Sequence, residues 1–119
     1  MSKSKSPLST TSFELSIEII NLCKRLNDKE FILSKQLLRS GTSVGANIRE
    51  AQFSESKKDF IHKLGISQKE CVETEYWLEL LKETDYLREK EFEITSNLCL
   101  QVYKMLSSSI ITARKNIKN

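Results

Sequence analysis

Apolar residues recur along the chain with the period of an α-helix, in four segments separated by short polar stretches. In the first segment, residues 12–26, two apolar stripes lie side by side at about 100° per residue. The stripes consist of Phe13, Ile17 and Ile20, and of Leu15, Ile19, Leu22 and Leu26. Together they form an apolar arc wider than a single bundle core needs. We therefore predict that this helix also contacts a second surface.

The second segment, residues 31–53, carries apolar or small residues at spacings of three and four, although its middle has low helix propensity. We predict one uninterrupted helix, because the apolar period runs through that middle without a phase break. The positions that follow this period are Leu33, Leu37, Gly41, Val44, Ile48 and Ala51. Gly41 and Gly45 lie four residues apart, so they share one side and allow another helix to approach closely.

The third and fourth segments, residues 57–84 and 88–118, repeat the helical pattern over greater lengths. A heptad-like seam marks the third helix, and it consists of Phe60, Leu64, Ser67, Cys71, Thr74, Leu78 and Leu81. The core face of the fourth helix is predicted at Phe92, Thr95, Cys99, Leu106, Ile110, Ala113 and Ile117. The spacings of Thr11 with Glu14 and of Ser56 with Asp59 match capping boxes, which predict the starts of the first and third helices.

Four helices joined by short turns predict antiparallel neighbours, so the expected fold is all-α, an antiparallel up-and-down four-helix bundle. Three Gly and one Pro are too few for a turn-rich β fold. Residues 1–10, rich in Ser and Lys, are predicted to form a flexible N-terminal tail. Residues 11–119 are predicted to form a single four-helix bundle domain.

The composition narrows the class of protein. No apolar run approaches the roughly 20 residues of a membrane span, and no secretory leader is recognisable, so we expect a soluble cytoplasmic protein. Cys23, Cys71 and Cys99 lack CxxC spacing and are expected to be reduced and buried, without a metal or other cofactor. The net charge of +3 permits contact with nucleic acid but does not indicate it.

Two long motifs resemble those of a known family. The first spans residues 36–51 (QLLRSGTSVGANIREA), and the second covers residues 60–71 (FIHKLGISQKEC) and 73–81 (ETEYWLELL). They are similar to the signatures of the bacterial four helix bundle protein family. That family includes the protein encoded within the intervening sequence of some 23S ribosomal RNA genes, also called S23 ribosomal protein. The resemblance covers roughly residues 13–117.

The resemblance implies a four-helix bundle that assembles into a homopentamer. It also implies kinship with the accessory variability determinant of diversity-generating retroelements, a basic pentameric barrel that binds nucleic acid and a reverse transcriptase. With 16 acidic residues, the present chain is less basic than that relative. The resemblance therefore implies architecture more firmly than activity.

Residues 41–45 spell G-x-S-x-G, the pattern of a hydrolase nucleophile elbow. That elbow requires a preceding strand and a histidine base. Here the motif falls within a predicted helix, and His62 is the only histidine of the chain. We therefore predict close helix packing at Gly41 and Gly45, and no enzyme.

Polar residues on the second and third helices form a second group of candidates. Glu73 lies between Ile66 and Trp77 on its own helix, so it is predicted to be partly buried and to need a donor or a cation. The candidate donors on the second helix are Arg39, Ser43, Asn47 and Arg49. A polar network that fixes helix register is the favoured interpretation, and a ligand or metal site is the alternative. The residues predicted for helix packing or an oligomer interface are Gly41, Gly45, Asn47, Glu70, Glu73 and Trp77.

Basic residues are dispersed over three helices. Those predicted to bind nucleic acid are Lys35, Arg39, Arg49, Lys57, Lys58, Arg114, Lys115 and Lys118. One interpretation is a solvated surface. The other is that a ring of five copies concentrates modest charge into a basic surface.

The sequence leads to two hypotheses about function. The first is a non-enzymatic homo-oligomeric scaffold, with the pentamer as its expected form, that binds RNA or a nucleic-acid-processing protein through a composite basic surface. The alternative is a structural or regulatory protein–protein interaction module without nucleic-acid binding. Neither involves a membrane or a small-molecule substrate.

Overall fold

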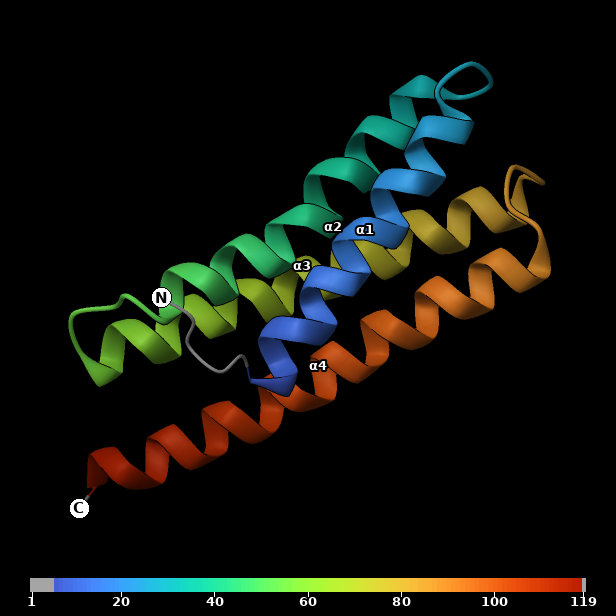
Figure 1. Cartoon of the computed structure of the whole chain (residues 1–119). Coiled ribbons are helices and arrows are strands. Elements are labelled where there is room, and N and C mark those ends of the chain that lie inside the picture. Colours follow the sequence, from blue (N-terminus) through green and yellow to red (C-terminus); the bar gives the residue numbers. More distant parts are fainter. Residues whose placement is uncertain (1–5, 119) are drawn as a thin grey trace.

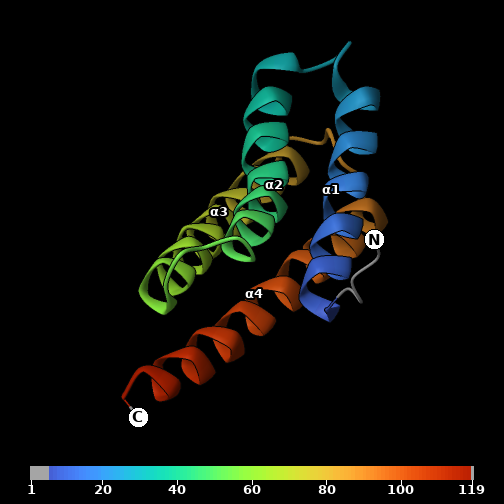
Figure 2. The same ribbon diagram turned by 60° about the vertical axis from the view of Figure 1, so that its left-hand side comes forward.

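The computed structural model describes residues 6–118, which form four α-helices joined by short turns (Figure 1). These helices are α1 (Pro7–Leu26), α2 (Phe31–Ala51), α3 (Lys57–Glu83) and α4 (Glu89–Lys118). Contacts join α1 with α2, α2 with α3, α3 with α4, and α1 with α4 (Figures 1 and 2). Each helix thus has two neighbours, and the all-α up-and-down bundle is confirmed. In the described part of the chain, none of these helices has the length and apolarity that crossing a membrane requires.

Helix α1 begins five residues earlier than predicted. Ser6 is its N-cap and accepts a hydrogen bond from the backbone N–H of Ser9 at 3.1 Å. Pro7 occupies the first turn, where its fixed φ suits a helix and its missing N–H costs no hydrogen bond. Leu8 packs against the core. The predicted tail is therefore wrong for residues 7–10, and residues 1–5 lie outside the described part of the chain.

The other helix ends agree with the prediction to within two residues. Helix α2 ends at Ala51 rather than 53. The predicted cap of α3 is confirmed, since Ser56 Oγ accepts from the backbone N–H of Asp59 at 3.0 Å. At the other end of α3, Asp85 has a φ of 68°. The N–H of Tyr86 then reaches back to the carbonyl of residue 81 at 2.8 Å, a pattern that satisfies the last carbonyls of a helix.

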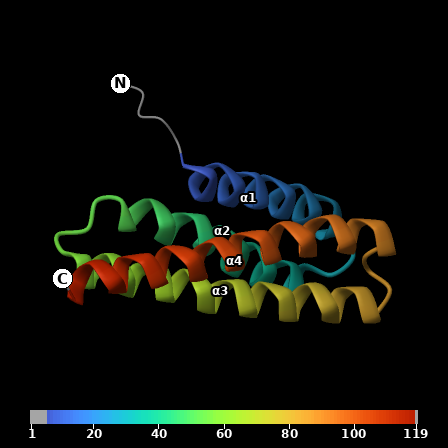
Figure 3. The ribbon, with the colours of Figure 1, turned by 90° about the horizontal axis from the view of Figure 1, so that it is seen from below.

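The buried core follows the predicted apolar stripes. Fully buried large side chains come from all four helices, and they include Leu15, Ile19, Leu26, Leu37, Val44, Leu64, Leu78, Leu81, Val102 and Leu106. Val102 was not predicted, although it lies three residues after Cys99 and four before Leu106. Ile117, predicted in the core, is 40% exposed. The reason is that the last turns of α4 extend past the first turn of α1, which cannot cover them (Figure 3).

Two hydrogen bonds inside the core join α2 to α3. Thr74 Oγ1 donates to Ser40 Oγ at 3.0 Å, and Ser67 Oγ donates to the carbonyl oxygen of Val44 at 2.8 Å. Ser40, Ser67 and Thr74 are all completely buried. Sliding α3 by one turn would leave these hydroxyls without partners, which is costly in an apolar core. The bonds therefore fix the register of the two helices.

Helices α1 and α2 approach closely at Gly41. A Cβ atom at this position would lie 2.8 Å from both Cγ1 and Cγ2 of Ile19, which is itself fully buried. The predicted close approach is therefore confirmed at Gly41, between two helices of the same chain. At Gly45 the nearest atom to such a Cβ would be Ser16 Oγ, at 3.3 Å. Gly65 on α3 has open space around it.

Gly41 and Gly65 allow a matched test of this packing. Gly41→Ala is expected to destabilise the fold by about 1–3 kcal/mol, because the methyl group would overlap the buried Ile19 side chain. Gly65→Ala is expected to stabilise it by about 0.5–1 kcal/mol, because alanine lowers the entropy cost of helix formation at an open site. Urea unfolding at one fixed protein concentration measures both changes. Equal effects of the same sign would contradict the close approach.

Candidate functional site

Apolar side chains that the core does not use gather on two sides of the bundle. On the α1/α2 side, Ile20 and Leu38 lie in one shallow cleft with Lys24 and Lys35. Ile17, one turn before Ile20, exposes 45% of its surface. We name Ile17, Ile20, Lys24, Lys35 and Leu38 the α1/α2 face. Exposure of Phe13, Ile17 and Ile20 confirms that the apolar arc of this helix exceeds the core.

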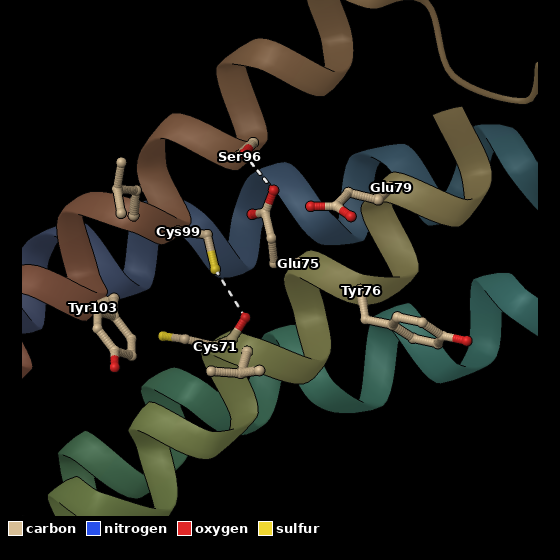
Figure 4. A pocket seen from close by; sticks show the side chains of 9 residues that line it. Cys71, Glu75, Tyr76, Glu79, Ser96, Cys99 and Tyr103 are labelled. Carbon is tan, nitrogen blue, oxygen red and sulfur yellow. Dashed lines mark hydrogen bonds between the residues drawn. The ribbon is translucent and has the colours of Figure 1, made fainter. Parts of the chain in front are cut away.

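The opposite side of the bundle, between α3 and α4, is hollowed into a groove of about 510 Å³. Val72 and Tyr76 of α3 are more than half exposed there, and Leu100 of α4 is 49% exposed. We name the lining residues the α3/α4 groove, and they are Cys71, Val72, Glu75, Tyr76, Glu79, Ser96, Cys99, Leu100 and Tyr103. Figure 4 shows Ser96 and Cys99 reaching from α4 towards Glu75 and Cys71 on α3.

Glu75 is a carboxylate of this groove that is hydrogen-bonded from α3 to α4. Ser96 Oγ donates a hydrogen bond to its Oε2 at 2.6 Å. Burial raises the pKa of Glu75, the hydrogen bond from Ser96 opposes this shift, and the charge of Glu79 adds to it. The groove thus carries two neighbouring carboxylates on α3 and no basic residue in its lining. It is an apolar surface of acidic character.

The three cysteines are free and buried, as predicted. Cys71 and Cys99, far apart in the sequence, meet at the floor of the groove, where Cys99 Sγ donates to the carbonyl oxygen of Cys71 at 3.4 Å. The hydrogen bond with Cys99 and burial raise the pKa of the Cys71 thiol. Burial also raises the pKa of Cys23. Neutral thiols are poor nucleophiles and poor metal ligands. The described residues contain no group of three or more side chains suited to hold a metal ion.

The predicted polar network lies between α2 and α3 and centres on Arg39. Its guanidinium forms ion pairs with Glu73 at 2.5 Å and with Glu70 at 3.4 Å. Trp77 Nε1 donates to the same Glu73 oxygen at 3.0 Å. The hydrogen bond from Arg39, followed by that from Trp77, lowers the pKa of Glu73, and the two carboxylates raise the pKa of Arg39. Of the four candidate donors on α2, the structure therefore selects Arg39.

Asn47 does not take part in this network. Its Nδ2 donates to the carbonyl oxygen of Ser43 on the same helix at 2.9 Å. Ser43 itself lies in the middle of α2, so helical residues rather than a strand lead into it, and the G-x-S-x-G pattern lacks the geometry of a nucleophile elbow. His62 is exposed on α3.

The predicted nucleic-acid-binding residues separate into three groups. Lys57 lines a cleft with Ala113 and Asn116 of α4, which brings the start of α3 beside the end of α4. The exposed basic residues at this end are Lys57, Lys58, Arg114 and Lys115, and we name them the basic end.

The other predicted residues lie elsewhere. Lys35 belongs to the α1/α2 face, and Arg49 lines a cleft on the same side of the bundle. Arg39 is engaged by two carboxylates. Lys118 ends α4, and its side chain lies outside the described part.

Sequence reasoning did not find the α3/α4 groove or Phe53. Val72, Leu100 and Tyr103 fall one position away from the core stripes, and this offset was the available signal of an apolar surface between α3 and α4. Phe53 lies in the turn before the basic end and is 80% exposed. Glu55, in the same turn, lowers the positive charge of that end. The signal for Phe53 in the sequence was an aromatic residue a few positions before two lysines.

The fold defines a class of protein, the small up-and-down four-helix bundle with more apolar surface than its core uses. Within this class, the chain belongs to the 23S rRNA-intervening sequence protein family, whose model matches residues 5–108.

A solved structure agrees with this membership. The crystal structure of a protein of unknown function from the S23 ribosomal protein family of Bacteroides thetaiotaomicron VPI-5482 is 48% identical in sequence. The match covers 87% of the present chain and 97% of that one, with a TM-score of 0.85. No curated protein matches the chain. The predicted family resemblance is thereby confirmed.

The network around Arg39 allows a test of its pH dependence. Arg39→Gln is expected to destabilise the protein by about 0.2–1 kcal/mol near neutral pH, because solvent screens this partly exposed pair. The pKa of Glu73 is lowered in the folded state. The stabilisation is therefore complete above the unfolded pKa of about 4.3 and is lost as the pH falls through the lower folded pKa.

Urea unfolding of both proteins over this pH range measures the difference. Glu73→Gln serves as the matched variant, and adding Arg39→Gln to it should have a smaller effect than in the native chain. A difference that persists unchanged at about pH 2, where carboxylates are protonated, would rule out the pair as its source.

Proposed function

We propose that this protein is a non-enzymatic, homo-oligomeric scaffold whose copies form a ring of five, and that the ring binds RNA through its basic ends. The presence of two different apolar surfaces on opposite sides of the bundle carries the proposal. The family provides the second line of support, since its name links these proteins to the intervening sequence of 23S ribosomal RNA.

Two opposite apolar surfaces favour one kind of assembly. A two-fold dimer uses the same patch on both subunits, so it covers only one of the two surfaces. Head-to-tail association joins the α1/α2 face of one copy to the α3/α4 side of the next and covers both. Such association closes into a ring when the rotation per subunit divides a full turn. Five is the copy number that the sequence resemblance implies.

The basic end supplies the support for RNA binding. Each subunit contributes Lys57, Lys58, Arg114 and Lys115, with the exposed ring of Phe53 nearby. Lysine and arginine bind phosphates by charge, and an exposed aromatic ring stacks on unpaired bases. Because cyclic symmetry places equivalent ends of all copies on the same side, a ring would gather five such clusters on one rim.

The assembly is testable by its native mass. Light scattering after size-exclusion chromatography is expected to give five subunits of 13.8 kDa at micromolar concentration. A monomer under these conditions would contradict the scaffold. A dimer would contradict head-to-tail association.

RNA binding is testable by its dependence on salt. The native chain is expected to shift structured RNA at low salt and to release it as salt rises, with a slope set by the number of phosphate contacts. Replacing both Lys58 and Lys115 by Ser should weaken binding and flatten this slope. Replacing Lys29 and Lys90 by Ser changes the net charge equally but at the opposite end, and should have little effect.

Two outcomes would count against the RNA part of the proposal. One is the absence of binding at low salt by a ring of the expected mass. The other is an equal effect of the two pairs of substitutions. Either result would favour the alternative, a scaffold that binds only proteins.

A further inference from the structure

The α1/α2 face and the α3/α4 groove carry opposite charges. Beside its apolar side chains, the face presents Lys24 and Lys35, and no acidic residue of the described chain lines the cleft that they share. The groove presents Glu75 and Glu79, and no basic residue among those described lines it. Lys35 and Glu79 are both exposed. Each surface therefore complements the other in charge and repels a copy of itself.

The charged residues also lie at matching heights along the bundle. The hydrogen bond between Ser40 and Thr74 sets one level common to α2 and α3. Lys35 lies five residues before Ser40, and Glu79 lies five residues after Thr74. Because the two helices are antiparallel, both residues lie about 7.5 Å from this level, towards the same end of the bundle.

The apolar residues match in the same way. Leu38 lies two residues before Ser40, and Tyr76 lies two residues after Thr74. Both therefore lie about 3 Å from the common level, towards the same end of the bundle as Lys35 and Glu79. Cyclic symmetry contains no translation along the ring axis. In a ring whose axis runs along the helices, residues at equal heights on the two surfaces therefore face each other across the subunit boundary.

We infer that the α3/α4 groove is the docking site for the α1/α2 face of a second copy of this chain. Leu38 packs against Tyr76, and Lys35 lies opposite Glu79. Ile17 and Ile20 cover the part of the groove formed by Leu100. The inference rests on the proposed homo-oligomer and specifies the pair of surfaces that forms its repeated interface.

A charge exchange tests this pairing. Lys35→Glu and Glu79→Lys should each weaken association on the order of tenfold or more, because each places like charges opposite one another. The chain that carries both substitutions restores an opposite pair and should recover most of the native association. Sedimentation at low and high salt measures the assembled fraction, and the effects should shrink as salt screens the charges.

Matched controls separate this effect from general charge and from folding. Lys90→Glu and Glu55→Lys make the same charge changes away from both surfaces, and they should leave the native mass unchanged. The circular dichroism spectra at low temperature are expected to be the same for all variants, since Lys35 and Glu79 are exposed and their replacement leaves the helices intact. The melting temperature is expected to fall only in the variants whose association weakens.

Cysteine cross-linking provides a second measurement. A mixture of Leu38→Cys chains with Tyr76→Cys chains should cross-link, whereas neither variant alone should. Cross-linking within a single variant would indicate a two-fold interface and overturn the inference.

The possible results separate the two proposals. A ring of normal mass in which no substitution acts and no mixed cross-link forms would refute the pairing and leave the scaffold standing. A native chain that stays monomeric at all concentrations would refute both.

Discussion

The register between α2 and α3 is set by two buried hydrogen bonds, and the heights of the surface residues follow from it. A core of leucine, isoleucine and valine alone would resist sliding less strictly, because the hydrophobic effect is non-directional. Thr74 bonded to Ser40, and Ser67 bonded to Val44, do not permit it. A slip would bury hydroxyls without partners. The same bonds place Lys35 level with Glu79 and Leu38 level with Tyr76, so an interior constraint controls the outer surfaces.

The close contact of α1 with α2 at Gly41 has a comparable effect on the first helix. With Ile19 pressed against a residue that has no side chain, α1 turns one apolar stripe inward and leaves the other outward. Exposed apolar residues are common on protein surfaces, so the outward stripe does not prevent a single chain from folding. Its position beside lysines, opposite an acidic apolar groove, is what connects the packing of the monomer to the proposed assembly.

Several titratable groups with shifted pKa values form ion pairs or hydrogen bonds with a neighbouring helix. Arg39 forms an ion pair with Glu73, Ser96 donates a hydrogen bond to Glu75, and Cys99 donates one to the backbone carbonyl oxygen of Cys71. The sequence indicated the first of these networks, because a carboxylate between apolar neighbours needs a cation. It did not indicate the other two, because Glu75 and Ser96, or Cys71 and Cys99, are brought together only when α3 and α4 pack. Their separation in the sequence gives no sign of the contact.

The sequence by itself determined the number of helices, their approximate ends and nearly all of the core, because helical periodicity is a local property of the chain. It misplaced the start of α1, where Pro7 begins a helix rather than precedes one. It also predicted that Ile117 is buried, although no other helix covers this side chain fully. Only the tertiary structure decided which basic residues are available to bind a partner. Arg39 forms ion pairs with carboxylates of the same chain, whereas Lys57 and Lys115 lie exposed at one end of the bundle. The tertiary structure alone also created the groove, because a concave surface between two helices depends on their separation and rotation, which no single segment encodes.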